Sequence, residues 1–200
     1  MISSHQLTVY RGRQRVIHHL SIQYPHTPFP PVLHIQGPNG SGKSTLITTL
    51  AQLLPYQGHL FWNGQPISSI PFFSQLGWCA DTPALPPFLT VYDALCRACV
   101  LKHRPPHLPP DLMDMLDLSA LFNARIHTLS FGSKKRLGIA LACITQPALV
   151  LLDEPTTGLD EPQQSRLFHW IADHPHTQWV IASHTSLPLS LSIQPVLLPC

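Results

Sequence analysis

The sequence carries little charge and only short apolar runs. Of its 200 residues, 11% are Asp, Glu, Lys or Arg, against about 25% in ordinary globular domains. The 12 basic and 10 acidic side chains leave a net charge of +2. This balance excludes a large electrostatic surface for nucleic acid or anionic lipid. A surface so poor in charge is harder to keep soluble alone, so we expect a partner to cover part of it.

Other absences narrow the class of protein further. The longest apolar stretches, such as residues 148–152, are far shorter than the roughly 18 residues that cross a bilayer. Residues 1–6 do not resemble a secretory leader. The 5 cysteines are odd in number and show no disulfide framework, and the 13 histidines show no convincing metal-ligand spacing. We therefore expect a soluble cytoplasmic domain without a structural metal.

A glycine-rich loop follows the first strongly predicted buried strand. Residues 31–36 predict that strand, and residues 37–45 match G-x-x-x-x-G-K-[ST] at every fixed position. A predicted helix over residues 46–54 follows and is stopped by Pro55. Glycines let backbone N–H groups turn around a phosphate, and the helix adds its positive N-terminal end. The expected nucleotide ligands are Gly37, Pro38, Asn39, Gly40, Ser41, Gly42, Lys43, Ser44 and Thr45.

A continuous apolar run later in the chain ends in two acidic residues. Residues 147–152 predict a parallel strand buried on both faces, because no polar residue alternates with the apolar ones. Ligands of such sheets bind at the carboxyl ends of strands, where Asp153 and Glu154 stand. Asp153 is expected to hold Mg²⁺ together with the Ser44 hydroxyl, and Glu154 to orient and deprotonate an attacking water.

Three further segments resemble motifs of one family. Residues 129–133 stand between the two motifs above, in the place of an LSGGQ signature; residues 155–160 are similar to a D-loop; and residues 179–184 predict a strand that ends in a histidine. With these motifs in order, essentially the whole chain resembles the nucleotide-binding subunit of an ABC transporter.

The resemblance implies a head-to-tail dimer of two nucleotide-binding subunits with ATP and Mg²⁺ between them. The phosphate loop of one subunit then faces Ser130 and Gly132 in the signature of the other, and Asp160 lies near the nucleotide. The start of a helix at Ser130 suits a γ-phosphate. His184 is expected to contact the same phosphate and to act with Glu154 in catalysis.

The chain departs from the family pattern at several positions. Asp81 stands where the family has a glutamine, and it is expected to be a ligand of Mg²⁺ or of water. Phe131 replaces the first signature glycine and Ser133 replaces the signature glutamine, which puts efficient turnover in doubt. The family places an aromatic ring near the N-terminus to stack on adenine. By register that position here is Arg11, whose planar guanidinium could stack on the base, and the ring of Tyr10 beside it is the alternative.

The predicted fold is an α/β P-loop NTPase of the ABC type. It has a RecA-like mixed or parallel sheet core, an N-terminal antiparallel β layer and an inserted α-helical lobe. Residues 59–62 and 65–67 flank Asn63-Gly64, a strong hairpin signal. The single domain 1–200 divides into an ATP-binding core, residues 1–80 and 135–200, and a lobe with the signature, residues 81–134.

In the lobe, residues 91–101 and 111–122 predict helices. The lobe also holds much of the proline, which at 22 residues is abundant in this chain. Its segment Pro86-Pro87-Phe88-Leu89 exposes apolar groups that could dock on a membrane subunit, although an ordinary loop plug explains the segment equally well.

These features together predict an ATP-hydrolysing subunit that drives a separate membrane permease from the cytoplasmic face of the inner membrane, with no nucleic-acid partner. The short length, the 61–64 hairpin and Arg11-Gly12 resemble the haem-exporter ATPase type of bacterial cytochrome c maturation. Two alternatives remain open: the ATPase of another small ABC exporter, and a degenerate cassette that binds nucleotide as a structural or regulatory module.

Overall fold

Two β-sheets of different type frame the chain. The computed structural model describes residues 1–23, 32–69, 71–188 and 190–198. One sheet is antiparallel, with strand order β2-β1-β4-β5, and the other is parallel, with order β6-β7-β8-β3-β9. The strands are β1 Ile2–Arg11, β2 Gln14–Ile22, β3 Val32–Gln36, β4 Gln57–Trp62, β5 Gln65–Pro66, β6 Leu76–Cys79, β7 Leu149–Asp153, β8 Gln178–Ala182 and β9 Ile193–Leu197.

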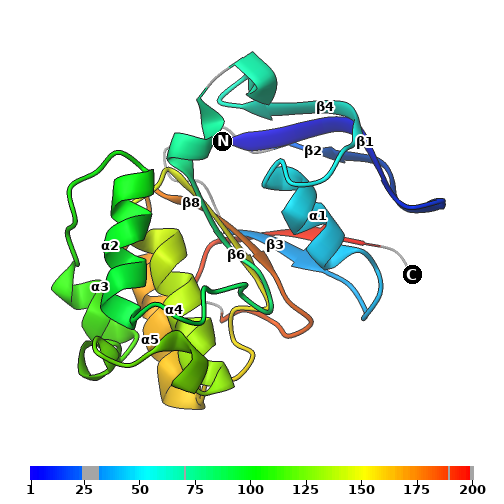
Figure 1. Cartoon of the computed structure of the whole chain (residues 1–200). Coiled ribbons are helices and arrows are strands. Elements are labelled where there is room, and N and C mark those ends of the chain that lie inside the picture. Colours follow the sequence, from blue (N-terminus) through cyan, green and yellow to red (C-terminus); the bar gives the residue numbers. More distant parts are fainter. Residues whose placement is uncertain (24–31, 70, 189, 199–200) are drawn as a thin grey trace.

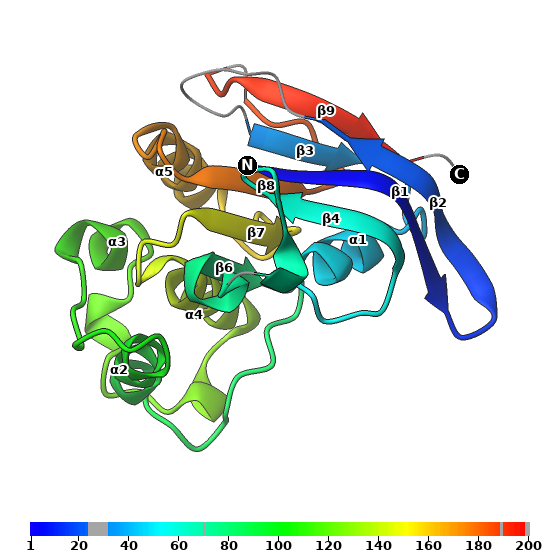
Figure 2. The same ribbon diagram turned by 90° about the horizontal axis from the view of Figure 1, so that it is seen from above.

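The helices fill the space between the sheets and cover the far face of the parallel sheet. They are α1 Lys43–Leu50, α2 Val91–Leu101, α3 Pro110–Met115, α4 Phe131–Cys143 and α5 Glu161–Ala172, with short 3-10 turns η1 Ile67–Ser69, η2 Phe72–Gln75, η3 Ser119–Leu121 and η4 Ile126–Thr128. Figure 1 shows α1 between the two sheets. Figure 2 shows α2 to α5 together on the side away from the β1–β2 hairpin.

The parallel sheet is buried on both faces, which explains the unbroken apolar run of β7. Leu149 and Leu151 face α1 and the antiparallel sheet. Val150 and Leu152 face the second cluster, which α2, α4 and α5 help to build. A strand covered on both faces gains from apolar residues at every position. The α/β prediction, with its antiparallel layer and its parallel sheet, is confirmed.

Most of the predicted elements form, with differences at their ends. The 59–67 hairpin is confirmed, because Phe61 pairs with Pro66 and Trp62 pairs with Gln65. The helix predicted over residues 46–54 begins earlier, at Lys43, and ends at Leu50. Gln52 then adopts a positive φ of 61°, which no helix continues. Pro31, the first residue of the predicted strand, lies outside the described residues.

The helix predicted over residues 111–122 is wrong in its second half. Helix α3 ends at Met115, and Asp117 adopts a positive φ of 49°. The Asp117 carboxylate accepts hydrogen bonds from Arg166 Nη1 and Nη2 at 2.9 and 2.7 Å and from Arg136 Nη1 at 3.2 Å. These contacts with α5 and α4 stabilise a turn that the apolar pattern does not reveal. Among the described residues, no helix is both long and apolar enough to cross a bilayer.

The Asp117 contacts predict an acid-sensitive share of stability. Hydrogen bonds from Arg166 hold the pKa of Asp117 below its usual value. We expect Asp117→Asn, which tolerates the same backbone conformation, to lower the free energy of unfolding by about 1 kcal/mol at pH 7. The difference should shrink as the pH falls below about 4, because a lowered pKa stabilises the fold only while the carboxylate stays ionised.

Urea unfolding of both proteins at several pH values between 7 and 3.5 measures this difference. Asp114→Asn, on the exposed side of α3, is the matched control and should be neutral throughout. A loss of stability in Asp117→Asn that is equal at all pH values would contradict the electrostatic origin.

Candidate functional site

The carboxyl ends of three neighbouring strands form one edge of the parallel sheet. Strand β8 lies between β7 and β3 and pairs with both in parallel. The glycine-rich loop that follows β3, Glu154 after β7 and His184 after β8 therefore meet at this edge, although they are far apart in the sequence. This is the edge at which ligands of open parallel sheets bind.

The phosphate loop wraps around the Lys43 ammonium. Lys43 is buried, and its Nζ donates hydrogen bonds to the carbonyl oxygens of Gly37 and Pro38 at 2.8 and 3.1 Å. Gly42 precedes α1 with a φ of 98°, and a Cβ there would lie 2.7 Å from Val16 Cγ1 on β2. Both the backbone conformation and the close approach of β2 therefore require glycine at this position.

The start of α1 offers backbone donors to a ligand. The N-cap of α1 is Gly42, which has no side chain. Within the described residues, no side chain therefore caps the first N–H groups of this helix. Pro38, Asn39 and Gly40 are exposed on the loop, whereas Thr45 is buried under it. Uncapped N–H groups and the positive end of a helix together attract an anion such as phosphate.

Asp153 and Ser44 face each other at this edge. Asp153 ends β7 and is buried, and its burial raises the pKa of the carboxyl while a hydrogen bond with Ser44 opposes that shift. Asp153 Oδ1 is buried and accepts no hydrogen bond from the described residues. A buried carboxylate oxygen without a partner next to a hydroxyl is a donor set that suits a hard cation such as Mg²⁺.

Glu154 lies between a lysine and a histidine. Its Oε2 accepts a hydrogen bond from His184 Nδ1 at 2.9 Å, and its Oε1 lies 3.9 Å from Lys43 Nζ. The Glu154 side chain is 13% exposed, whereas His184 is 58% exposed. Glu154 adopts a φ of 45°, and its N–H donates to Ala182 O at 2.8 Å on β8. The strained backbone thus turns the carboxylate toward the phosphate loop and His184.

Lys135 is a residue of this region that sequence reasoning passed over as part of a short basic run. Its side chain is fully buried, and its Nζ donates to the backbone oxygens of Ala80, Asp81 and Asp153 at 3.1, 2.9 and 2.6 Å. Asp81 Oδ1 also lies 3.6 Å from this ammonium. Lys135 on α4 therefore joins the chain after β6 to the end of β7.

Asp81 lies near Asp153, and its charge contributes to the raised pKa of that group. Its Oδ1 is buried and accepts no hydrogen bond in the described part of the chain. The carboxylate that replaces the family glutamine thus stands opposite the Lys135 charge, which offsets the cost of bringing another acidic group to this edge.

The signature residues contact the loop before α5. Ser130 is exposed and caps α4, because its Oγ accepts from Ser133 N at 3.1 Å. Phe131 is 48% exposed and its ring lies against Gly158, where a Cβ would come within 2.7 Å of Phe131 Cδ1. A Cβ on Gly132 would lie 2.4 Å from Gly158 O. Phe131 and the glycine-containing loop are thus complementary in shape.

The other predicted nucleotide ligands lie at the periphery of this site. Asp160 is exposed and caps α5 in a capping box with Gln163, whose N–H donates to Asp160 Oδ1 at 2.8 Å. Within the described residues, no hydrogen bond or ion pair joins Ser130, Gly132 or Asp160 to the phosphate loop. The single chain therefore assembles Lys43, Asp153, Glu154 and His184 but not the signature.

Tyr10 and Arg11 lie at the exposed end of the β1–β2 hairpin. Tyr10 pairs with Arg15 and Arg11 pairs with Gln14, and both side chains are exposed. Val16, one residue after Arg15, reaches Gly42 of the phosphate loop together with Ile17. The sequence carried no signal for this contact, because Val16 is an ordinary strand residue until the two segments are placed together.

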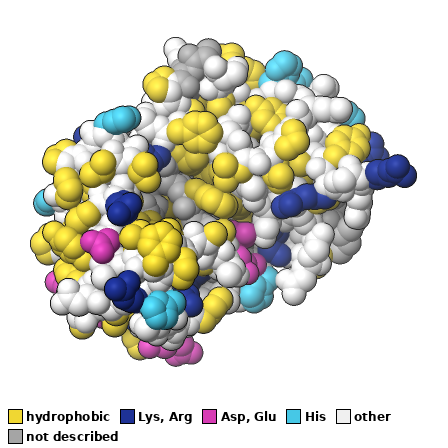
Figure 3. Space-filling view, in the orientation of Figure 1, with side chains coloured by type: hydrophobic (Ala, Val, Ile, Leu, Met, Phe, Trp, Pro, Cys, Tyr) yellow, Lys and Arg dark blue, Asp and Glu magenta, His cyan; other side chains and the backbone are white. Residues whose placement is uncertain are grey.

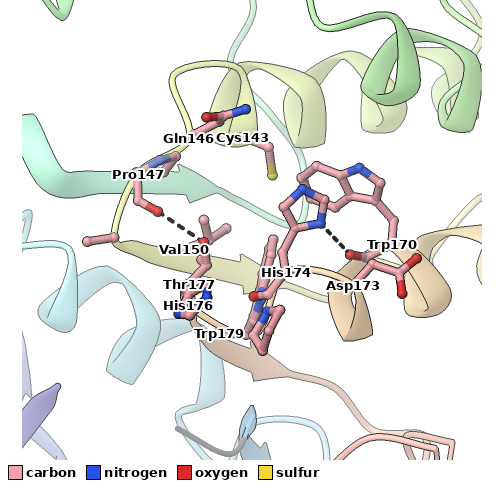
Figure 4. A pocket seen from close by; sticks show the side chains of 12 residues that line it. Cys143, Gln146, Pro147, Val150, Trp170, Asp173, His174, His176, Thr177 and Trp179 are labelled. Carbon is pink, nitrogen blue, oxygen red and sulfur yellow. Dashed lines mark hydrogen bonds between the residues drawn. The ribbon is translucent and has the colours of Figure 1, made fainter. Parts of the chain in front are cut away.

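A separate cavity of about 350 Å³ lies near the amino ends of β7 and β8, at the opposite edge of the parallel sheet. Figure 4 shows Trp170, His174 and Trp179 along one side of it. The Trp170 and His174 rings lie 4.0 Å apart between their centroids, and Trp179 Nε1 donates to His174 O at 3.2 Å. This cavity is distinct from the edge that gathers Lys43 and Glu154.

Comparisons with known proteins agree with the motifs. Residues 30–157 match the sequence family described as ABC transporter. The chain is 35% identical over 152 residues to the cytochrome c biogenesis ATP-binding export protein CcmA of Pseudomonas savastanoi pv. phaseolicola, covering 72% of this chain and 69% of that protein. It is 30% identical over 193 residues to the CcmA of Bartonella henselae, covering 96% and 90%.

Other members of the family also match. The chain is 31% identical over 185 residues to the ferric enterobactin transport ATP-binding protein FepC of Escherichia coli, covering 84% of this chain and 65% of that protein. Among solved structures, a dimeric bacterial ABC transporter cassette superposes with a TM-score of 0.80 at 18% identity, covering 98% of this chain and 94% of the other. At that identity the likeness shows the fold alone.

The phosphate loop, the acidic strand end and the histidine after β8 meet at one sheet edge, and the sequence family that contains these motifs matches well over half of the chain. The chain belongs to the ABC transporter family, as an ATP-hydrolysing, ATP-binding subunit.

Proposed function

We propose that the chain hydrolyses ATP at the edge described above, paired with a second nucleotide-binding subunit, to drive a membrane permease. The observation that carries this proposal is the position of Glu154, with one carboxylate oxygen 2.9 Å from His184 Nδ1 and the other 3.9 Å from Lys43 Nζ. A base between two cationic or donor groups at the end of a phosphate loop has the arrangement that phosphoryl transfer to water requires.

Binding of ATP would exchange contacts that the loop now makes within itself. The Lys43 ammonium, now bonded to Gly37 and Pro38 carbonyls, would turn to the β- and γ-phosphate oxygens. The uncapped N–H groups of α1 and the loop residues Asn39 to Thr45 would bind the remaining phosphate oxygens. Tyr10 or Arg11 on the β1–β2 hairpin would stack on the base.

Ser44 and Asp153, with Asp81 beside them, would hold Mg²⁺. A bound magnesium ion would neutralise charge on the phosphates. Asp153 would be ionised in that state, since a neighbouring cation offsets the burial that raises its pKa. The unpartnered oxygens of Asp153 and Asp81 are the groups of this chain that gain most from such a cation.

Glu154 would take the proton from the attacking water. In the structure its two oxygens contact His184 and Lys43. A γ-phosphate would attract the His184 ring and the Lys43 ammonium, which leaves the Glu154 carboxylate to orient water. His184, which is exposed, can make this change without loss of a buried contact.

A second subunit would supply the signature that the single chain does not bring to its own phosphate loop. Ser130 and Phe131 are exposed at the start of α4 and Gly132 is half-buried beside them, and Asp160 follows the Gly158 turn that supports this segment. We propose that these groups face the nucleotide of the partner subunit. We also propose the division into a core, residues 1–80 and 135–200, and a lobe, residues 81–134, that moves relative to it.

The lobe carries apolar side chains that a permease would cover. Figure 3 shows apolar groups spread over the face that includes α2. Phe88 and Leu101 are 67% and 79% exposed, and Tyr92 and Val100 lie between them in sequence and are exposed as well. Contact of this surface with a membrane subunit would place the chain, as a peripheral protein, at the cytoplasmic face of the inner membrane.

We propose that the transported substrate is haem, in the maturation of c-type cytochromes, and the matches to cytochrome c biogenesis export proteins support this proposal. The chain aligns with one cytochrome c biogenesis ATP-binding export protein over 96% of its own length and 90% of that protein. Identities near 30% and the match to an enterobactin transport protein leave another small ABC exporter as the second candidate.

Removal of the Glu154 charge tests the hydrolytic role. We expect Glu154→Gln to lower kcat for ATP hydrolysis by about 100-fold or more, because general base catalysis contributes at least that much. ATP binding should persist, since Lys43 and the loop are unchanged, and ATP-bound dimers should accumulate. Phosphate release and the binding of a fluorescent ATP analogue measure the two effects.

Glu161→Gln, an exposed residue in the first turn of α5, is the matched control and should retain wild-type turnover. Equal kcat in wild type and Glu154→Gln would exclude the proposed base. Absence of turnover in both, with binding unchanged, would favour a degenerate cassette.

Complementation tests the haem-export role. In a bacterium that lacks its own CcmA, we expect this chain to restore covalent haem in c-type cytochromes, as measured by haem staining of periplasmic protein. Glu154→Gln should not restore it. Failure of the wild-type chain, together with co-purification of a different permease, would identify another exporter.

The departures from the family pattern generate a separate prediction. Asp81→Gln and Phe131→Gly bring back the family residues. If these departures slow hydrolysis, the double variant should raise kcat several-fold without changing ATP affinity. Steady-state ATPase assays measure this. A fall in kcat would instead mean that Asp81 with Lys135, or Phe131 with Gly158, has become part of the working site.

A further inference from the structure

A buried histidine lies behind the loop that carries His184. His34 is in the middle of β3, opposite Ile181 of β8, and is 1% exposed. Gln36 Nε2 donates a hydrogen bond to His34 Nδ1 at 3.0 Å. Since Nδ1 accepts, Nε2 must carry the ring proton, and it lies 2.8 Å from Ser183 Oγ.

The same chain of hydrogen bonds continues into the loop. Ser183, which is also 1% exposed, donates from Oγ to Thr185 O at 2.6 Å. Its backbone N–H donates to Ile35 O at 3.2 Å. Gln36, His34 and Ser183 thus each donate to the next group in one direction, and the last acceptor is the residue that follows His184.

This arrangement depends on a neutral ring. Burial lowers the pKa of His34, against the opposing effect of the Glu154 charge. A neutral imidazole can accept from Gln36 and donate to Ser183 at once, whereas an imidazolium can only donate. Because buried polar groups cost free energy unless they are paired, each link stabilises its neighbour.

If His34 only satisfied its own hydrogen bonds, the hydrogen bonds that begin at its ring would not need to reach the loop that carries His184. Here Ser183 precedes His184 directly, and Thr185 follows it, so both flanking residues take part in the hydrogen bonds that begin at His34. His184 itself is exposed, and within the described residues its side chain bonds Glu154 alone. Its position therefore depends on how firmly the two flanking residues are held.

We propose that His34 is a positioning residue for His184, acting through Ser183 and Thr185. This inference rests on the proposed role of His184 at the γ-phosphate. Loss of the His34–Ser183 link would let the loop after β8 shift, and displacement of a catalytic contact by about 1 Å costs up to about 100-fold in rate. ATP binding would change little, because the hydrogen bonds of Lys43 within the phosphate loop involve neither His34 nor Ser183.

Two substitutions of His34 separate the links. Glutamine extends about as far as Nε2 and can donate to Ser183, whereas asparagine extends only about as far as Nδ1 and keeps the contact with Gln36. We expect His34→Asn to lower kcat about tenfold with KM within about twofold of wild type. His34→Gln should stay within about twofold of wild type in both constants.

A second readout follows the loop directly. Hydrogen exchange measured by mass spectrometry should show faster exchange over residues 184–187 in His34→Asn than in His34→Gln. Ser183→Ala should behave like His34→Asn, and Ser183→Thr, which keeps the hydroxyl, like His34→Gln. These variants test the same link if His34→Asn folds poorly. His59 is an exposed residue of β4, so His59→Asn and His59→Gln are the matched controls and should behave like wild type.

Equal kcat and equal loop exchange in His34→Asn, His34→Gln and wild type would overturn the proposal, as would a parallel loss in both variants with KM raised. His184→Ala separates this failure from failure of the proposed function. If His184→Ala hydrolyses ATP normally, the role of His184 is wrong, whereas the exchange difference between the two His34 variants still tests the link itself.

Discussion

The position of β8 between β7 and β3 is the constraint on which the site depends. Parallel pairing on both sides of β8 brings the ends of three strands to one edge. Glu154, held by its N–H to Ala182 O, can then reach His184 and approach Lys43. A strand order that moved β3 away from β7 and β8 would separate the phosphate loop from the acidic pair, and the same residues would carry no common chemistry.

Buried polar side chains connect this edge to the rest of the molecule. Lys135 on α4 binds the backbone of residues 80–81 and of Asp153. A movement of the chain after β6 would therefore displace the end of β7. His34 similarly connects β3 to the loop after β8. Each of these groups is costly to bury unless all its hydrogen bonds form, which makes the geometry at the edge specific.

Much of the fold could be predicted because it depends on local patterns. The apolar run of residues 147–152, the Asn63-Gly64 turn and the glycine-rich loop each carry their own signal. The helix over residues 111–122 could not be bounded, because its end at Met115 depends on contacts of Asp117 with Arg166 and Arg136. Lys135 and His34 were missed because the burial of a charged or polar side chain depends on distant segments.

The sequence by itself determined the chemistry: a phosphate loop, two acids at the end of a buried strand, a histidine after another, and their order along the chain. Each of these is a short motif whose function depends on residue type and spacing. Only the tertiary structure decided which of them meet. It places Glu154 against His184 and Lys43, because the parallel pairing of β8 with β3 joins segments more than 100 residues apart in the sequence.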